Sequence, residues 1–404
     1  MITTGENIPD DLSDDDVYYN RVSGKSYTRS LRDFHNLFVK KFLISSVSNK
    51  GNTLIDYAVG KGGDFTKWIA AKMSFVLGID ISKDNIENKL DGACARYLNY
   101  KKQYKIMPDA LFVQGNSSLN IKDGTALYSD KGSQIIKAVF GEGPKEKDVL
   151  GAGVYKQYGK GSEGFNISSI QFALHYFFEN KRTLNSFLRN IAECTKLNGY
   201  FIGACYNGEK IFNLLKSKNK GESVSLFHDD KKIWSVTKQY DRDDFNNDET
   251  GLGYAIDVYQ ETINKTFREY LVNFSYLERI MENYGFVLLN SEECADLNIK
   301  NSVGSFQELY NLMNEEIKRR RKNDYGDSLK MNTKEKQISF YNNYFIFKKV
   351  RTVNAKNISD QFKDISILRE ELEIGETKKA IAVAEDVIPE IKAPKKLKKK
   401  LILK

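Results

Sequence analysis

The sequence predicts an α/β fold with a mostly parallel sheet and helices on both of its faces, and three observations lead to that prediction. Apolar, strand-like runs alternate with helical patterns from about residue 54 to residue 205, as in sheets built from strand–helix–strand units. A glycine-rich turn, Gly60 to Gly63, follows the first run, and an acid, Asp80, ends the second. Such features favour a nucleotide-type ligand at the strand ends.

Composition sets outer limits on the protein. At 404 residues the chain can hold one large α/β domain with additions, or two modest domains. Its net charge of +8 is compatible with an anionic partner such as nucleic acid, and equally with a well-solubilised surface. We find no long apolar span and expect a soluble protein that does not bind a membrane. The cysteines lack CxxC spacing, so we expect reduced thiols and no metal site; they are Cys94, Cys194, Cys205 and Cys294.

Periodicity gives the expected elements in order. Helical spacing of apolar residues predicts helices, and short apolar runs bounded by turn residues predict strands. We expect a helix over 31–43, a strand over 54–56, a helix from 68, a strand over 75–80, a helix over 81–104, and strands over 110–113, 165–170 and 199–205, followed by strands over 256–259, 267–272 and 344–349.

The chain divides into one main domain and two ends. Residues 1–28 are acidic and predict a flexible arm, and residues 351–404 form a charged extension that ends in a lysine-rich tail. Residues 29–350 form the main domain. Within it, residues 122–164 are rich in Gly and Lys with patchy periodicity, which predicts an inserted loop.

The glycine turn and its flanking acids indicate half of a site for an adenosine cofactor. Asp80 can accept hydrogen bonds from both hydroxyls of a ribose. A nicotinamide dehydrogenase would want Gly at Ala58, whereas a methyl donor of the S-adenosylmethionine type tolerates variation there. Asp56 favours the methyl donor, because an acid at the end of the first strand can engage its ammonium group. Asn116 follows the third strand and either faces adenine or caps a turn.

A second motif lies after the fourth strand, where Gln171-Phe172 is followed by His175-Tyr176. Together with Gly-Lys-Gly-Gly-Asp at 60–64 and Phe-His-Asn at 34–36, it resembles the messenger RNA cap (guanine-N7) methyltransferase family. The likeness covers roughly residues 30–350 and is greatest to the methyltransferase domains of capping enzymes from large DNA viruses. The resemblance implies a Rossmann-like class I fold that uses S-adenosylmethionine.

The resemblance also implies residue roles on the donor side. Lys40 and Asp56 would meet the amino-acid end of the methyl donor, Asp80 its ribose, and Asn116 its adenine. The full set of implied cofactor-binding residues is Lys40, Asp56, Ala58, Gly60, Asp80, Asn116, Ser117 and Gln171.

On the acceptor side the resemblance implies a guanine pocket and a path for the cap phosphates and ribose. Asn36, Lys61 and Lys67 match positions near the phosphates and ribose, His175 and Tyr176 line the pocket and orient the base, and Glu269 reads the guanine. A tyrosine typical of the last strand falls at Asn342, between Tyr341 and Tyr344; which of the three faces the cap stays open, and Tyr341 is our candidate. The chain departs from the family at Ala58, at Asn116 and at Tyr206, where Pro is common.

The chemistry of guanine agrees with these roles. Its N1–H and its exocyclic amine are adjacent donors that one carboxylate, Glu269, can accept together. N7 carries a lone pair and no proton, so we expect no acid or base catalyst; orientation can supply up to ~7–11 kcal/mol.

These inferences predict methyl transfer from S-adenosylmethionine to N7 of the cap guanine, with capped RNA as partner. Triphosphatase and guanylyltransferase modules, in the same or another chain, are further expected partners. Two rivals stay open: methylation of another RNA base, and a non-catalytic RNA-binding or scaffold role, which the departures from the family at Ala58 and Asn116 suggest. We expect a cytoplasmic location, with a viral factory or virion as alternatives.

Overall fold

The computed structural model describes residues 26–361. Described residues up to Ser359 belong to one compact unit, which contains two sheets. Most of the expected acidic arm and nearly all of the lysine-rich extension lie outside the described residues. Within the described part of the chain, every helix is too short or too polar to cross a membrane.

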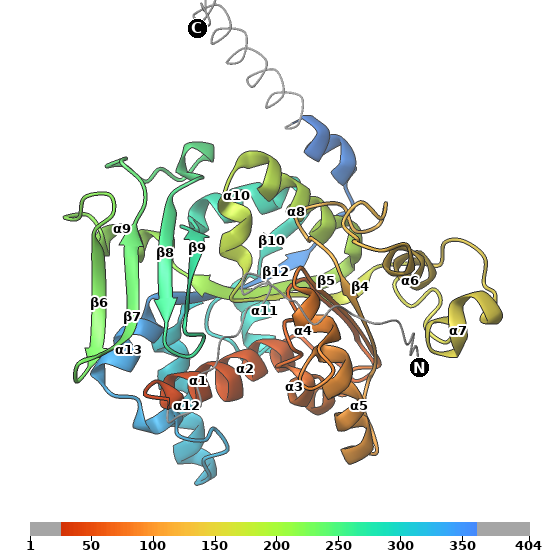
Figure 1. Ribbon diagram of the computed structural model, residues 1–404, viewed down its shortest axis with the longest axis horizontal. Helices are drawn as coiled ribbons and strands as arrows, with labels where there is room; N and C mark the ends of the chain where they lie inside the picture. The colour runs from red at the N-terminus through yellow and green to blue at the C-terminus, as the bar shows by residue number, and fades with distance from the viewer. Residues whose placement is uncertain (1–25, 362–404) are drawn as a thin grey trace, which may run out of the picture. The chain divides into compact units, whose positions relative to one another are not determined.

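The main sheet has the strand order β10-β12-β5-β4-β1-β2-β3, with β11 paired to β12 (Figure 1). The pairs among β1 to β5 are parallel, as the sequence predicts, and β12 runs antiparallel to β5. The chain builds the sheet from β1 toward β3 on one side and toward β5 on the other, so the strand order reverses at β1. In such sheets ligands bind at the point of reversal, beyond the carboxyl ends of the strands. The strands are β1 (Thr53–Asp56), β2 (Phe75–Asp80), β3 (Asp109–Gln114), β4 (Phe165–Gln171), β5 (Thr195–Tyr206), β10 (Phe286–Leu288), β11 (Val303–Ser305) and β12 (Asn342–Lys349).

Helices cover both faces of this sheet. Alternate strand residues point to opposite faces, so Leu54 and Val76 join one apolar core, whereas Ile55 and Leu77 join another. The first core contains α2 (Lys40–Ser46), α3 (Phe65–Ala70), α5 (Ala93–Gln103) and α12 (Phe306–Arg320), and the second contains α6 (Asp130–Phe140), α8 (Lys181–Cys194) and α10 (Phe274–Asn283). The predicted two-sided architecture is confirmed.

A second, antiparallel sheet, which we call the small sheet, has the order β6-β7-β8-β9. Its inner side chains, among them Trp234 and Ile256, join the same core as α2 and α12, and Figure 1 shows its strands beside the main sheet. This sheet carries Glu269 on its last strand. Its strands are β6 (Ser223–His228), β7 (Lys231–Lys238), β8 (Ala255–Gln260) and β9 (Lys265–Tyr270). The other helices are α9 (Gly208–Leu214), α11 (Ser291–Asp296), α13 (Thr333–Phe340), η4 (Glu249–Gly251) and η5 (Ser328–Lys330).

The first helical segment ties the small sheet to the main domain. It consists of α1 (Arg29–Asp33), the π-helical η2 (Phe34–Val39) and α2. The hydroxyls of Ser26 and Thr28 donate to Glu261 Oε2, after β8, at 2.9 and 2.8 Å. The Leu31 N–H donates to Glu335 of α13 at 3.1 Å. The segment that carries Asn36 and Lys40 is therefore held at both the small sheet and α13.

Residues 122–164 correct one expectation. They form α6 and α7 (Lys147–Tyr155) rather than a loop. Ile136 and Val139 of α6 are fully buried against the main sheet. Glycines at the end of α6 and inside α7 obscure the helical pattern in the sequence. Gly141 ends α6 at φ 80°, and Gly151 breaks α7 at φ 74°. The helix expected over 81–104 is likewise divided, into α4 (Lys83–Glu87) and α5.

Candidate active site at the carboxyl edge of the sheet

Polar side chains from separate strands meet at the carboxyl edge of the main sheet. Parallel strands place their carboxyl ends at the same edge, so residues far apart in sequence become neighbours. The residues that end or follow these strands are Asp56 on β1, Asp80 on β2, Asn116 after β3, Gln171 on β4 and Tyr206 on β5.

The glycine turn is bound to the acid that ends β2. The Gly60 N–H donates to Asp80 Oδ2 at 2.7 Å, and the Ser82 N–H and the Asn85 side chain donate to Oδ1 at 3.0 and 2.9 Å. Gly62 is required as glycine, because at its φ of +69° a Cβ would lie 2.5 Å from the Phe65 ring. A carboxylate has about four acceptor positions, so Asp80 keeps capacity for a ligand hydroxyl.

Asp56 is a buried acid with little internal compensation. It accepts the Ala58 N–H at 3.1 Å, and burial, reinforced by nearby Asp64, raises its pKa to about 7. A ligand cation at this position would favour the ionised form. The donor to Asp56 is a backbone group, so the contact does not depend on which side chain stands at position 58.

Asp64 lies between two lysines. Lys40 Nζ is 3.3 Å from its Oδ2, and Lys67 Nζ is 3.1 Å from its Oδ1. Burial favours protonated Asp64, but the two ammonium groups outweigh it and hold the pKa of this carboxyl below its usual range. Lys67 also donates to the Gly63 carbonyl at 2.7 Å and is buried. Its ammonium group is thus engaged by Asp64 and by the Gly63 carbonyl, and its expected position near the cap phosphates and ribose stays a prediction.

Lys61 is likewise engaged on the donor side. Its Nζ lies 2.8 Å from Asp84 and 2.7 Å from Asp91, both in the segment after β2. The Lys61 carbonyl accepts from Arg96 at 2.6 Å. The geometry therefore makes Lys61 a clamp between the glycine turn and α4, and its expected contact with the cap phosphates stays a prediction.

The residues after β3 adopt the turn that the sequence left as an alternative. Asn116 Oδ1 accepts from the N–H and the hydroxyl of Ser118 at 2.9 and 2.6 Å. The Ser117 hydroxyl donates to the Tyr57 carbonyl at 2.8 Å and is buried. The amide oxygen of Asn116 shapes the loop, so an adenine contact by this residue would come from its NH₂ group.

Phe172 was missed as a functional candidate, although it lies between Gln171 and His175. It has φ +60°, a left-handed conformation that is unusual for a bulky residue. Its ring is stacked on His35, with centroids 5.1 Å apart and planes 13° apart, and Lys40 Nζ lies 5.8 Å from its centroid. Phe172 therefore redirects the backbone between the donor and acceptor groups. The motif marked this position, but a left-handed backbone cannot be read from its sequence.

His175 and Glu269 meet in a buried, uncharged contact. His175 lies in the 3₁₀ helix η3 (Leu174–Phe178), and its Nδ1 is 3.6 Å from Oε2 of Glu269. Burial lowers the pKa of His175 to about 3 and raises the pKa of Glu269 to about 8. At neutral pH both groups are mainly uncharged, so the contact is not an ion pair.

Buried polar atoms without hydrogen-bond partners occur at this contact and at the end of β4. Buried side-chain atoms nearly always have a hydrogen-bond partner. Among the described residues, the exceptions include both ring nitrogens of His175, Oε2 of Glu269 and Oε1 of Gln171. Tyr176 packs its ring edge to face with His175, at 4.3 Å between centroids. These atoms present donors and acceptors that a ligand can satisfy.

The structure distinguishes the three residues considered for the last strand. Tyr341 precedes β12 at the carboxyl edge, where Asn342 is paired with Tyr206, and its ring is stacked on Trp234 at 5.6 Å. Asn342 is buried and donates to the Ser339 carbonyl, and Tyr344 is buried and donates to the Asn301 carbonyl. Of the three, only Tyr341 is not buried, and its role at the cap stays a prediction. Asn36 lies half-buried in η2, one turn before Lys40.

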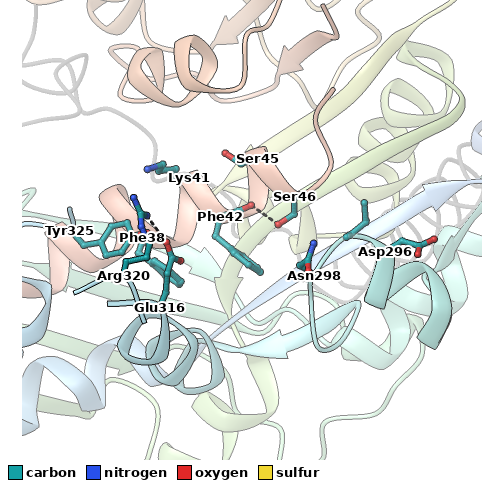
Figure 2. A pocket seen from close by; sticks show the side chains of 11 residues that line it. Phe38, Lys41, Phe42, Ser45, Ser46, Asp296, Asn298, Glu316, Arg320 and Tyr325 are labelled. Atoms are coloured by element: carbon teal, nitrogen blue, oxygen red, sulfur yellow. Dashed lines mark hydrogen bonds and ion pairs between the residues drawn. The ribbon is translucent and has the colours of Figure 1, made fainter. Parts of the chain in front are cut away.

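A separate cavity of about 380 Å³ lies between α2, the end of α11 and α12. Figure 2 shows Glu316 and Arg320 below Phe38 at one end, with Asp296 and Asn298 at the other. Glu316 is already bound by Arg320 at 2.8 Å and by the Tyr325 hydroxyl at 2.7 Å. None of the predicted site residues lines this cavity. Within residues 26–361, no group of three or more His, Cys, Asp or Glu side chains could hold a metal ion.

Comparison with known proteins agrees with this geometry. The family described as "mRNA (guanine-N(7))-methyltransferase domain" matches residues 15–350. A probable mRNA-capping enzyme of Acanthamoeba polyphaga mimivirus is 26% identical over 89% of this chain and 31% of its own length. The mRNA cap guanine-N(7) methyltransferases of Eremothecium gossypii and Saccharomyces cerevisiae are 26% and 25% identical, over 67% and 64% of this chain and 56% and 51% of their own lengths.

The chain thus spans about a third to a little over half of these relatives. Among solved structures, the CcbJ methyltransferase of Streptomyces caelestis aligns over 82% of this chain and 95% of its own, at 12% identity and a TM-score of 0.42. The strand order and the two helical layers are those of a Rossmann-like class I S-adenosylmethionine-dependent methyltransferase. With the family match across residues 15–350, they establish that the chain belongs to the mRNA (guanine-N(7))-methyltransferase family.

Proposed function

We propose that this chain transfers a methyl group from S-adenosylmethionine to N7 of the terminal guanine of the mRNA 5′ cap. The observation that carries the proposal is the set of buried, unpartnered polar atoms of Gln171, His175 and Glu269. Gln171 ends β4 at the edge that carries Asp56 and Asp80, and His175 of η3 contacts Glu269 of the small sheet. A base with several hydrogen-bonding atoms on one edge is the kind of ligand that would satisfy them.

The donor half fits the zwitterionic end of S-adenosylmethionine. The buried carboxyl of Asp56, with its raised pKa, would be stabilised as the anion by the ammonium group of the donor. Lys40, now beside Asp64, would bind the donor carboxylate, and Lys67 would remain to neutralise Asp64. Asp80 would accept a ribose hydroxyl while it holds the glycine turn.

The acceptor half fits guanine. Glu269 would ionise when the base binds, and accept N1–H and the exocyclic amine. His175 and Tyr176 would orient the base, and Tyr341 would form a further wall. The pocket would then select guanine over adenine. Adenine lacks the N1–H, so it would leave the buried Glu269 carboxylate without one of its two hydrogen bonds.

The chemical step needs no protein acid or base. The N7 lone pair attacks the methyl carbon, the C–N bond forms as the carbon–sulfur bond breaks, and the sulfonium becomes the neutral thioether of S-adenosylhomocysteine. The positive charge moves to the purine, where the nearby carboxylate of Glu269 stabilises it. We assign the rate enhancement to alignment of N7, carbon and sulfur, and no step requires a metal.

The proposal extends to partners and location. Capped RNA would be the substrate, and triphosphatase and guanylyltransferase modules in this or another chain would supply the GpppN end. We propose a cytoplasmic site of action, with a viral factory or virion as alternatives. The scaffold rival rested partly on Ala58, and it loses that support because position 58 contributes its backbone N–H.

The test is product analysis. The protein is incubated with methyl-labelled S-adenosylmethionine and GpppA-capped RNA, the RNA is digested, and the nucleosides are separated. We expect N7-methylguanosine from the wild type and none from Glu269→Ala, with calorimetry showing that the variant still binds S-adenosylhomocysteine. Label in another nucleoside would support the rival RNA base, and absence of cofactor binding by the wild type would support the scaffold role.

A further inference from the structure

The hydroxyl of Tyr206 joins the two sheets beside the acceptor pocket. Tyr206 ends β5 of the main sheet. Its oxygen accepts from Trp234 Nε1 at 3.0 Å and from Gln260 Nε2 at 3.1 Å, both on the small sheet. The Tyr206 side chain is buried; its bond from Trp234 is buried and its bond from Gln260 is partly buried. Two strands of one sheet are thereby attached to a single atom of the other.

The register of the strands makes this bridge well defined. Trp234 of β7 and Gln260 of β8 are directly paired, so their side chains reach the same point. Tyr206 is paired with Asn342, which places it beside Tyr341. The Trp234 ring lies nearly parallel to the Tyr341 ring, with 13° between the planes, and covers one of its faces.

The bridge lies where the two halves of the reaction must be aligned. Donor-binding residues stand on the main sheet, whereas Glu269 stands on β9 of the small sheet, paired with Ile256 of β8. Burial and the nearby Glu269 carboxyl both raise the pKa of the Tyr206 hydroxyl, so the two groups share one electrostatic neighbourhood. A shift of the small sheet would move Glu269 relative to the methyl donor.

We infer that Tyr206 and Trp234 are positioning residues. They hold the two sides of the acceptor pocket, Glu269 and Tyr341, in a fixed position relative to the edge of the main sheet that binds the methyl donor. This inference rests on the proposed function. It also explains a departure of this chain from its family, because a proline at position 206 could not accept these two hydrogen bonds.

The kinetic test compares Tyr206→Phe with Tyr344→Phe. Each change removes one buried hydroxyl, but the Tyr344 hydroxyl binds the Asn301 carbonyl beside β11, away from the pocket. Leaving buried donors unpaired weakens the structure that they hold, so Tyr206→Phe should raise KM for GpppA-capped RNA about tenfold. KM for S-adenosylmethionine should stay within about twofold, and Tyr344→Phe should change neither KM by more than that.

A spectroscopic test reads the bridge directly. The chain contains two tryptophans, so labelling with 5-fluorotryptophan gives two ¹⁹F resonances, and Trp234→Phe identifies the one from Trp234. Addition of GpppA to the full chain should shift the Trp234 resonance, and addition of S-adenosylhomocysteine alone should leave it in place. In Tyr206→Phe the starting position of this resonance should already differ from that of the wild type.

The outcomes separate this inference from the proposed function. If the wild type makes N7-methylguanosine but Tyr206→Phe and Tyr344→Phe give the same KM for capped RNA, the positioning role is wrong and the function stands. A Trp234 resonance that ignores GpppA would also overturn the positioning role. If the wild type makes no N7-methylguanosine, the function itself fails.

Discussion

Replacing Glu269 by Gln should stabilise the protein while it abolishes cap recognition. The amide keeps the shape of the side chain and cannot ionise. In the folded protein, burial raises the pKa of Glu269 from the ordinary 4.5 to about 8. Below pH 4.5 the group is protonated in both the folded and the unfolded chain, so Glu269 and Gln should give similar stability.

Between pH 4.5 and 8 the unfolded chain gains free energy by ionising Glu269, whereas the folded chain keeps the proton. Wild-type stability is lost progressively across this window, by at most about 1.4 kcal/mol per pH unit. The stability difference between Glu269→Gln and wild type should therefore grow from pH 5 to pH 8 and then level off. Nearby His175 is unchanged in the variant, so the difference isolates Glu269.

Urea unfolding of both proteins at pH 5, 6, 7, 8 and 9 measures this difference. A stability difference that does not depend on pH would show that Glu269 is not a buried, protonated carboxyl. Activity gives a second readout. About one Glu269 in eleven is ionised at pH 7 and half at pH 8 when the pKa is 8, so wild-type kcat/KM for capped RNA should rise about fivefold over that interval. Glu269→Gln should lose about 100-fold or more.

Three further sets of substitutions test the roles of two donor-side lysines and the backbone conformation at Phe172. Lys67→Met should lower the free energy of unfolding in urea by about 2 kcal/mol, because it removes a buried partner of Asp64. KM for capped RNA should stay unchanged. A tenfold higher KM for capped RNA at full stability would instead place Lys67 at the cap phosphates. Lys40→Met should weaken S-adenosylhomocysteine about tenfold in calorimetry without changing KM for capped RNA, and normal cofactor affinity would remove Lys40 from the donor site. Phe172→Gly should be about 1 kcal/mol more stable than Phe172→Ala, because only glycine adopts φ +60° without cost; the reverse order in urea would contradict a strained Phe172.

Periodicity and strand-end chemistry were enough to predict the parallel strands of the main sheet, whereas the short strands β10 and β11 were not predicted. Buried parallel strands such as β2 (Phe75–Asp80) are continuous apolar runs, and they stand out from the helices between them. Asp56 and Asp80 could be placed at one edge because parallel strands share their carboxyl ends. The α6 helix escaped prediction because glycines at its end and in the following helix disturbed the pattern of its apolar residues.

Side-chain directions at the site could not be read from the sequence. Lys61 and Lys67 have long, flexible side chains, and the acids that bind them decide where they point. One of these acids, Asp91, lies 30 residues along the chain from Lys61. The burial of His175 and Glu269 likewise depends on the packing of the small sheet against η3 and β5. Sequence motifs predicted which residues belong to the site, but tertiary packing determines whether their side chains are charged.

A structure of the protein bound to S-adenosylhomocysteine and GpppA would test the central claim most directly. We expect the Glu269 carboxylate to lie within about 3 Å of both N1 and the exocyclic amine of the cap guanine. We also expect N7 of the same base to face the cofactor sulfur across the carboxyl edge of β4. A guanine bound with its N7 turned away from the sulfur, or with Glu269 out of contact, would contradict this claim.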